Sequence, residues 1–122
     1  MKRILIIGPM GSGKTRKIKE MMSGEKNVKY MDPRLPIYYV VKKTNPKWVV
    51  LDDMDLKWLE HHMMHVNRFP RINMLFAYQG TLKELPSWVR FWDWDKIIDM
   101  SNGMTYEKDI IGEGKTESNT TF

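Results

Sequence analysis

Two patterns of hydrophobic residues alternate along this chain. Short, nearly continuous apolar runs occur at residues 3–7, 48–53 and 72–79, and shorter apolar stretches at residues 28–32 and 96–100 are expected to be strands too. Runs of this kind are typical of strands that are buried on both faces of a sheet. Residues 37–43 (IYYVVKK) form a further apolar run after a proline-containing break, and we interpret them as another short strand.

Between these runs, apolar residues recur at three- and four-residue spacing, as at Leu56, Leu59 and Met63, and this spacing predicts helices. We expect helices at residues 14–23, 55–67 and 81–92, the last one interrupted at Pro86, and a hairpin arm at residues 103–111. Strands that alternate with helices predict a three-layer α/β fold with a mostly parallel sheet of about five strands. Residues 1–111 are expected to form one domain, followed by a polar tail at residues 112–122.

Composition narrows the class of protein. The chain of 122 residues is 42% hydrophobic and 29% charged, which is typical of a globular domain. It has no cysteine, so disulfides and thiolate zinc sites are excluded, and we expect a reducing compartment, the cytoplasm. No apolar run approaches the roughly 20 residues of a membrane-spanning helix. The net charge of +5 favours a phosphate-rich partner, although it is also compatible with a merely solvated surface.

The most specific motif is GPMGSGKT at residues 8–15, which fits the pattern G-x-x-x-x-G-K-[ST] between an expected strand and an expected helix. Its glycines allow backbone N–H groups to point at phosphate oxygens, and the helix start adds its positive dipole end. Lys14 is expected on the β- and γ-phosphates and the Thr15 hydroxyl on Mg²⁺. The expected nucleotide contacts are Gly8, Pro9, Met10, Gly11, Ser12, Gly13, Lys14, Thr15 and Arg16.

Two adjacent acids end the apolar run WVVLDD. Asp52 is assigned to the Mg²⁺ through a water, and Asp53 is the candidate that orients or deprotonates an attacking water. A structural role as a helix N-cap is the preferred interpretation of Asp55. Gln79 ends the next buried run, where parallel strands would bring it close to the γ-phosphate, and it is the candidate sensor of that group.

These segments resemble the additional-strand branch of the P-loop ATPases, and within it the FtsK/HerA-like DNA translocases and viral genome-packaging ATPases. YMDP resembles their Asp-Pro turn, VVLDDM their double-acid strand, and NRFPRINMLFAYQG their Arg-containing turn followed by an apolar strand and a terminal Gln. The resemblance covers most of residues 3–100. It implies an ATP- and Mg²⁺-dependent motor that acts on double-stranded DNA as a homo-oligomeric ring.

The same resemblance implies an arginine that reaches the nucleotide of a neighbouring subunit, and Arg68, Arg71 and Arg90 are the candidates. Where the cellular translocases usually have Glu, this chain has Asp53. GPMGSGKT is also similar to the loop of the thymidine kinases that carry a zinc-binding lasso, but the four cysteines of that lasso are missing. A deoxynucleoside kinase and a nucleotide-binding module without hydrolysis therefore remain as alternatives.

One further pair has the spacing of metal ligands. His61 and His65 lie four residues apart in an expected helix, but no third ligand is evident. A solvated, mildly basic helix surface is the preferred interpretation.

Overall fold

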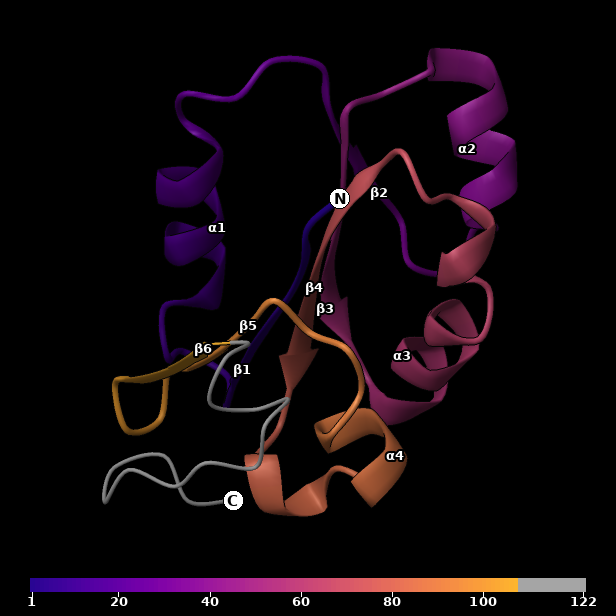
Figure 1. Ribbon diagram of the computed structural model, residues 1–122. Helices are drawn as coiled ribbons and strands as arrows, with labels where there is room; N and C mark the ends of the chain where they lie inside the picture. Colours follow the sequence, from indigo (N-terminus) through magenta and orange to yellow (C-terminus); the bar gives the residue numbers. More distant parts are fainter. Residues whose placement is uncertain (108–122) are drawn as a thin grey trace.

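Six strands form one mixed sheet in the computed structural model, which describes residues 1–107 (Figure 1). Their order is β2-β3-β4-β1-β5-β6, and all neighbours are parallel except β5 and β6. The strands are β1 (Arg3–Gly8), β2 (Val28–Met31), β3 (Trp48–Met54), β4 (Asn73–Gln79), β5 (Lys96–Asp99) and β6 (Met104–Glu107). The architecture is therefore α/β with a mostly parallel sheet.

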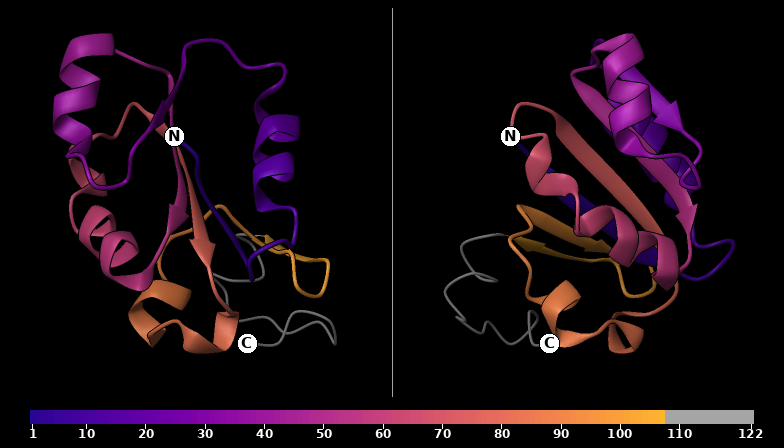
Figure 2. Two further views of the ribbon diagram at one scale, coloured as in Figure 1. Left: turned by 180° about the vertical axis from the view of Figure 1, so that it is seen from behind. Right: turned by 90° about the vertical axis from the view of Figure 1, so that its right-hand side faces the viewer.

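Helices cover both faces of this sheet (Figures 1 and 2). They are α1 (Lys14–Met22), α2 (Ile37–Thr44), α3 (Leu56–Met63) and α4 (Ser87–Arg90), with 3-10 turns η1 (Val66–Arg68) and η2 (Leu82–Glu84). Among the described residues, α1 packs on one face, while α2, α3 and α4 pack on the other. No helix within residues 1–107 is long and apolar enough to span a bilayer.

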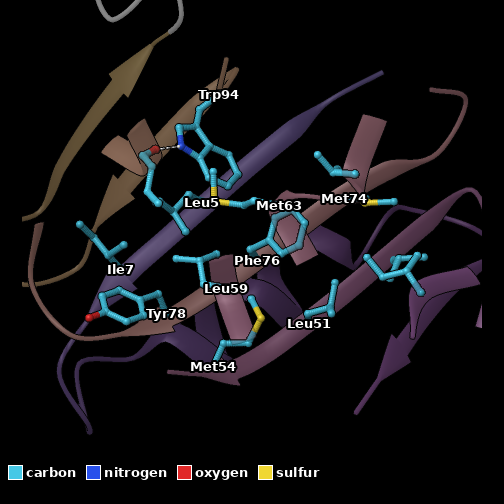
Figure 3. Close-up of a cluster of buried hydrophobic side chains, with 14 of the residues drawn as sticks. Leu5, Ile7, Leu51, Met54, Leu59, Met63, Met74, Phe76, Tyr78 and Trp94 are labelled. Atoms are coloured by element: carbon cyan, nitrogen blue, oxygen red, sulfur yellow. Dashed lines mark hydrogen bonds between the residues drawn. The ribbon is translucent and has the colours of Figure 1, made fainter. Parts of the chain in front are cut away.

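The continuous apolar runs are explained by this double coverage. In β1, Ile4 and Ile6 pack toward α1, whereas Leu5 and Ile7 pack toward the opposite helices. Side chains of a strand alternate between faces, so a strand covered on both sides is apolar at every position. The larger of the two cores contains Phe76 and Trp94 with their rings at 5.7 Å (Figure 3).

The strand order sets the position of the candidate site. β4 lies between β1 and β3, and Gly8 at the end of β1 is in register with Gln79 at the end of β4. Because these strands are parallel, the segments that follow β1, β3 and β4 meet at one edge of the sheet. The loop, the acidic pair and Gln79 are all placed there, as the sequence predicted.

The structure corrects the prediction for residues 37–43, which form helix α2 and not a strand. The apolar residues Ile37 and Val40 are buried on one side of α2 while Tyr38 and Tyr39 are exposed, so the run is amphipathic with a helical period. Pro36, with φ −67°, lies at the N-cap, where its missing N–H costs nothing.

Other expectations are confirmed with shifted bounds. The predicted helix at residues 81–92 is divided at Pro86 into η2 and α4, and the helix at residues 55–67 ends in the separate turn η1. The expected hairpin arm exists as β6, which pairs antiparallel with β5, so the sheet has six strands where about five were expected. Residues 108–111 of that arm and the predicted tail at residues 112–122 lie outside the described residues.

Candidate functional site

The loop between β1 and α1 is shaped by glycines at its two ends. A Cβ on Gly8 would lie 2.4 Å from Ser12 Oγ and 3.0 Å from Met100 Cβ, so any larger residue there would have to displace these side chains. Gly13 has φ 95° at the N-cap of α1, a left-handed conformation that strongly favours glycine. No side chain caps α1, so the first N–H groups of this helix face the loop without an intrahelical partner. Such a helix start attracts anions.

Lys14 folds back over this loop. Its Nζ donates to the carbonyl oxygens of Gly8 (2.8 Å) and Pro9 (3.0 Å), and the side chain is buried, with 8% of the residue exposed. An ammonium group has three donors, so these two bonds leave one for a ligand. The geometry holds a positive charge at the centre of the loop.

Thr15 and Asp52 are in direct contact. The Thr15 hydroxyl donates to Asp52 Oδ2 at 2.9 Å, across 37 positions of sequence. These are the two residues that the sequence assigned to Mg²⁺, one from the loop and one from β3. Hydroxyl and carboxylate oxygens are hard ligands of the kind that Mg²⁺ prefers, and Mg²⁺ sites commonly add only one or two carboxylates to water and phosphate oxygens.

Asp53 lies in a bulge at the end of β3. Leu51 pairs with Phe76 and Met54 with Tyr78, so β3 has one residue more than β4 over this interval. Asp53 takes up the extra length with φ 59°, and its N–H donates to Asp52 Oδ1 at 2.7 Å. Bulges beside functional sites re-aim side chains, and a left-handed non-glycine residue costs backbone energy. The two acids are therefore held differently, although they are adjacent in sequence.

A cavity of about 850 Å³ connects these groups. The loop side contributes the cations Lys14 and Arg16, and the sheet side contributes Asp52, Asp53 and Gln79. Gln79 is exposed at the end of β4, as predicted. A cavity with cations on one wall and carboxylates on the other suits a polyphosphate that carries a divalent cation.

A second cavity of about 450 Å³ adjoins the first, with which it shares Asp52, Asp53 and Gln79. Its far wall includes Trp58 and an ion pair in which Arg34 donates to both oxygens of Asp32 at 3.0 and 2.8 Å. These hydrogen bonds lower the pKa of Asp32 to about 2. The sequence indicated the Asp-Pro turn but not Arg34 or Trp58, because their proximity to the acids depends on how β2 and α3 pack.

Asp55 has the structural role that was preferred for it. Its carboxylate accepts from the N–H of Trp58 at 3.0 Å and caps α3. Asp55 also lines the second cavity, but the capping hydrogen bond is enough to explain an aspartate at this position.

The three candidate arginines are not brought to the cavity within this chain. Arg68 and Arg71 are exposed before β4, and its seven residues, at about 3.3 Å each, separate them from Gln79 by roughly 20 Å. Arg90 lies in α4 and lines a different cavity with Asp99 and Ser101. A role for any of them at the nucleotide would have to be played in a neighbouring subunit, and it stays a prediction.

Arg3 and His62 are buried polar side chains that the sequence did not indicate. The Arg3 guanidinium donates to the carbonyl oxygens of Phe69 (2.7 Å) and Ile72, and burial lowers its pKa. His62 is 1% exposed and its Nε2 is hydrogen-bonded to the carbonyl oxygen of Pro33. No local sequence pattern predicts these contacts, because the carbonyl groups that accept the hydrogen bonds belong to turns far away in the sequence. His62 ties α3 to the Asp-Pro turn beside the second cavity.

The histidine pair does not gain a further ligand. His61 and His65 lie with ring centroids 5.2 Å apart, but no group of three or more His, Cys, Asp or Glu side chains with metal-binding geometry occurs within residues 1–107. The preferred interpretation, a surface-exposed helix face, fits His61, which is exposed.

Comparison with known proteins adds no assignment to this geometry. No protein-family model matches the chain, and no similar curated protein was found.

Proposed function

We propose that this chain is a Mg²⁺-dependent ATPase with the three-layer fold of the P-loop NTPases. The observation that carries the proposal is the hydrogen bond between Thr15 and Asp52. It joins the last residue of a phosphate-loop motif to an acid from a separate strand, at the side of the cavity where Mg²⁺ is needed. A glycine-rich turn with no nucleotide function has no need of that acid.

The sheet order supports assignment to the additional-strand branch. The resemblance implies an extra strand that ends in a polar residue near the γ-phosphate, and β4 lies between the loop strand and the acidic strand and ends in Gln79. Its register places Gln79 opposite Gly8 at the start of the loop.

Catalysis would then be positioning plus charge stabilisation. Lys14, Arg16 and the free N–H groups at the start of α1 hold the phosphates, and Thr15 and Asp52 hold Mg²⁺, which neutralises phosphate charge. Asp53 and Gln79 orient a water toward the γ-phosphorus. The water oxygen bonds to phosphorus as the bond to the bridging oxygen of ADP breaks, and Asp53 accepts the proton.

We further propose that hydrolysis drives movement of double-stranded DNA and that the active form is a ring. The net charge of +5 and the resemblance to packaging ATPases support this part. Arg68, Arg71 or Arg90 would complete the site of a neighbouring subunit, since none of the three lines the phosphate cavity of its own chain.

A second candidate function is transfer of the γ-phosphoryl group to a nucleoside. The specific observation in its favour is the adjoining cavity of about 450 Å³, because it opens beside Asp53 and Gln79 and is walled by Trp58, on which a base could stack.

The fate of the γ-phosphoryl group separates these functions. We would incubate the protein with γ-labelled ATP and Mg²⁺, with and without a deoxynucleoside, and identify the labelled product. The ATPase proposal expects inorganic phosphate without an acceptor and its loss in Lys14→Ala, but not in Lys19→Ala, which alters an exposed lysine of the same helix. Labelled nucleotide would favour the kinase, and ATP binding without any product would leave a non-hydrolysing module.

A further inference from the structure

A groove between α2 and the end of α3 lies away from the candidate nucleotide site. Figure 1 shows α2 and α3 on the same side of the sheet. The groove encloses about 650 Å³, and none of its lining residues lines either cavity at the loop. From α2 it is lined by Ile37 and Tyr38. On the other side it is lined by His61 in α3, by His65 just after α3, and by Arg68 and Phe69 in the turn that follows. We call it the α2–α3 groove.

The charge of the α2–α3 groove is of one sign. Arg68 is a permanent cation in the lining, and no carboxylate contributes to it. The helix α2 adds Lys42 and Lys43 and has no acidic residue. Such a surface is complementary to a polyanion.

Aromatic rings are arranged among these cations. Tyr38 and Tyr39 are 62% and 50% exposed, although aromatic side chains of this size usually bury most of their surface. Lys42 lies 5.8 Å from the Tyr38 ring and Lys43 lies 4.3 Å from the Tyr39 ring. Lys42 follows Tyr38 by one helical turn, and Lys43 Nζ donates to the Tyr39 hydroxyl at 2.6 Å, so each tyrosine has a cation beside it at the edge of the groove.

The combination distinguishes between polyanions. An acidic peptide would use the cations but not the apolar floor of Ile37 and Phe69. A duplex keeps its bases stacked inside, so it would present backbone and base edges but no base face on which Tyr38 could stack. A single strand presents phosphates together with unstacked bases, and basic grooves with aromatic side chains bind it in both ways.

We propose that the α2–α3 groove binds single-stranded nucleic acid, with Tyr38 stacking on a base and Lys42 and Arg68 contacting phosphates. This inference goes beyond the proposed function, because neither hydrolysis nor a duplex partner is needed for it.

The test is the affinity for a fluorescent oligo-deoxythymidine, measured by anisotropy without nucleotide over a range of salt concentrations. Tyr38→Ala should weaken binding about fivefold or more, since base stacking contributes at least that much. Lys42→Glu should weaken it too and reduce the slope of log affinity against log salt by about 0.7, because one fewer phosphate is neutralised. Lys19→Glu, an equal charge reversal on the opposite face, should leave the affinity close to that of the unaltered protein.

Several results would overturn the inference. The first is that Tyr38→Ala and Lys42→Glu bind the single strand as tightly as the unaltered protein does. The second is that the protein binds the matching duplex more tightly than the single strand. The third is that a polyglutamate peptide binds and the single strand does not. Self-association that Tyr38→Ala abolishes would assign the groove to a second copy instead. Lys14→Ala separates the two proposals, because it should lose ATP hydrolysis and keep strand binding.

Discussion

At the scale of single residues, the site depends on two adjacent carboxylates that the backbone holds differently. Asp52 continues the direction of β3 and bonds to Thr15, whereas Asp53 lies in the bulge with φ 59°. A left-handed aspartate at a sheet edge is unusual, although Asp and Asn adopt this conformation more readily than most residues. The bulge therefore supports separate roles, Mg²⁺ binding for Asp52 and water activation for Asp53.

Asp53→Asn tests that division. The amide cannot accept a proton, so we expect the rate of ATP hydrolysis to fall about a hundredfold or more, the usual contribution of a general base. ATP affinity and thermal stability should be unchanged, because Asn tolerates the left-handed conformation. Phosphate release and ATP binding are the two measurements, with Asp55→Asn as the control in the adjoining cavity. Unchanged hydrolysis in Asp53→Asn would remove this residue from the mechanism.

His62 gives the fold a predicted sensitivity to acid. Burial lowers the pKa of His62 below its ordinary value of 6.5, with a smaller lowering from the charges of His61 and His65 and an opposing effect of the bond to Pro33. The unfolded chain then binds a proton that the folded one resists. The stability from His62 is complete above about pH 6.5 and is lost as the pH falls through the lowered value.

His62→Gln should weaken this dependence, because the amide can keep the hydrogen bond to Pro33 without titrating. We would measure the free energy of unfolding by denaturant titration between about pH 7 and pH 5, the range in which histidine changes charge. His61→Gln, at an exposed position, should keep most of the loss. An equally steep loss in His62→Gln would show that another group is responsible.

At the scale of elements, α3 connects the acidic strand to the rest of the molecule. Asp55 begins it by accepting from the N–H of Trp58, and His62 ties its last turn to Pro33. The helix thus fixes both the turn after β3 and the wall of the second cavity.

Asp55→Ala should therefore destabilise the protein by about 1 kcal/mol, the typical cost of losing an N-cap. Asp55→Asn should be nearly neutral, because Asn is an equally good cap. Chemical denaturation of the two variants measures the difference. If both variants were equally stable, the cap would contribute nothing and Asp55 would become a candidate for the chemistry of the cavity.

Element by element, the sequence was informative where the signal is local. Strands buried on both faces are apolar at every position, and the phosphate loop combines three glycines with Lys14 in one short motif. Residues 37–43 were mistaken for a strand because Ile37, Val40 and Val41 make the run look continuous, while the exposure of its two tyrosines is visible only in the fold. Periodicity does not encode the packing between segments that are distant in sequence. It therefore could not predict the bulge at Asp53, the hydrogen bonds of Arg3, or the position of Arg34 in the wall of the second cavity.

At the scale of the whole molecule, the sheet separates the candidate nucleotide site from two of the candidate arginines. Its carboxyl edge has the loop, the acids and Gln79, whereas Arg68 and Arg71 precede β4 at the other end of that strand. A single chain therefore cannot bring these two arginines to its own phosphate loop, and in the proposed ring they could reach only the loop of a neighbouring copy.

The proposed ring predicts that ATP hydrolysis per molecule rises with protein concentration. If one of the three arginines acts in a neighbouring subunit, its Ala variant should be inactive alone but regain activity when it is mixed with Lys14→Ala, which still supplies that arginine. Phosphate release from the mixtures is the measurement. A rate per molecule that is independent of concentration, together with no rescue in any mixture, would argue for a monomeric enzyme or a kinase.

Every proposal about the site requires that the loop at residues 8–15 binds the phosphates of ATP, and calorimetric titration of ATP in the presence of Mg²⁺ measures this binding. We predict one ATP per chain for the unaltered protein and for Lys19→Ala. Lys14→Ala should bind about tenfold or more weakly, because it loses a charge-assisted hydrogen bond to phosphate. If the unaltered protein did not bind ATP, or if Lys14→Ala bound it equally well, the loop would not be the phosphate site.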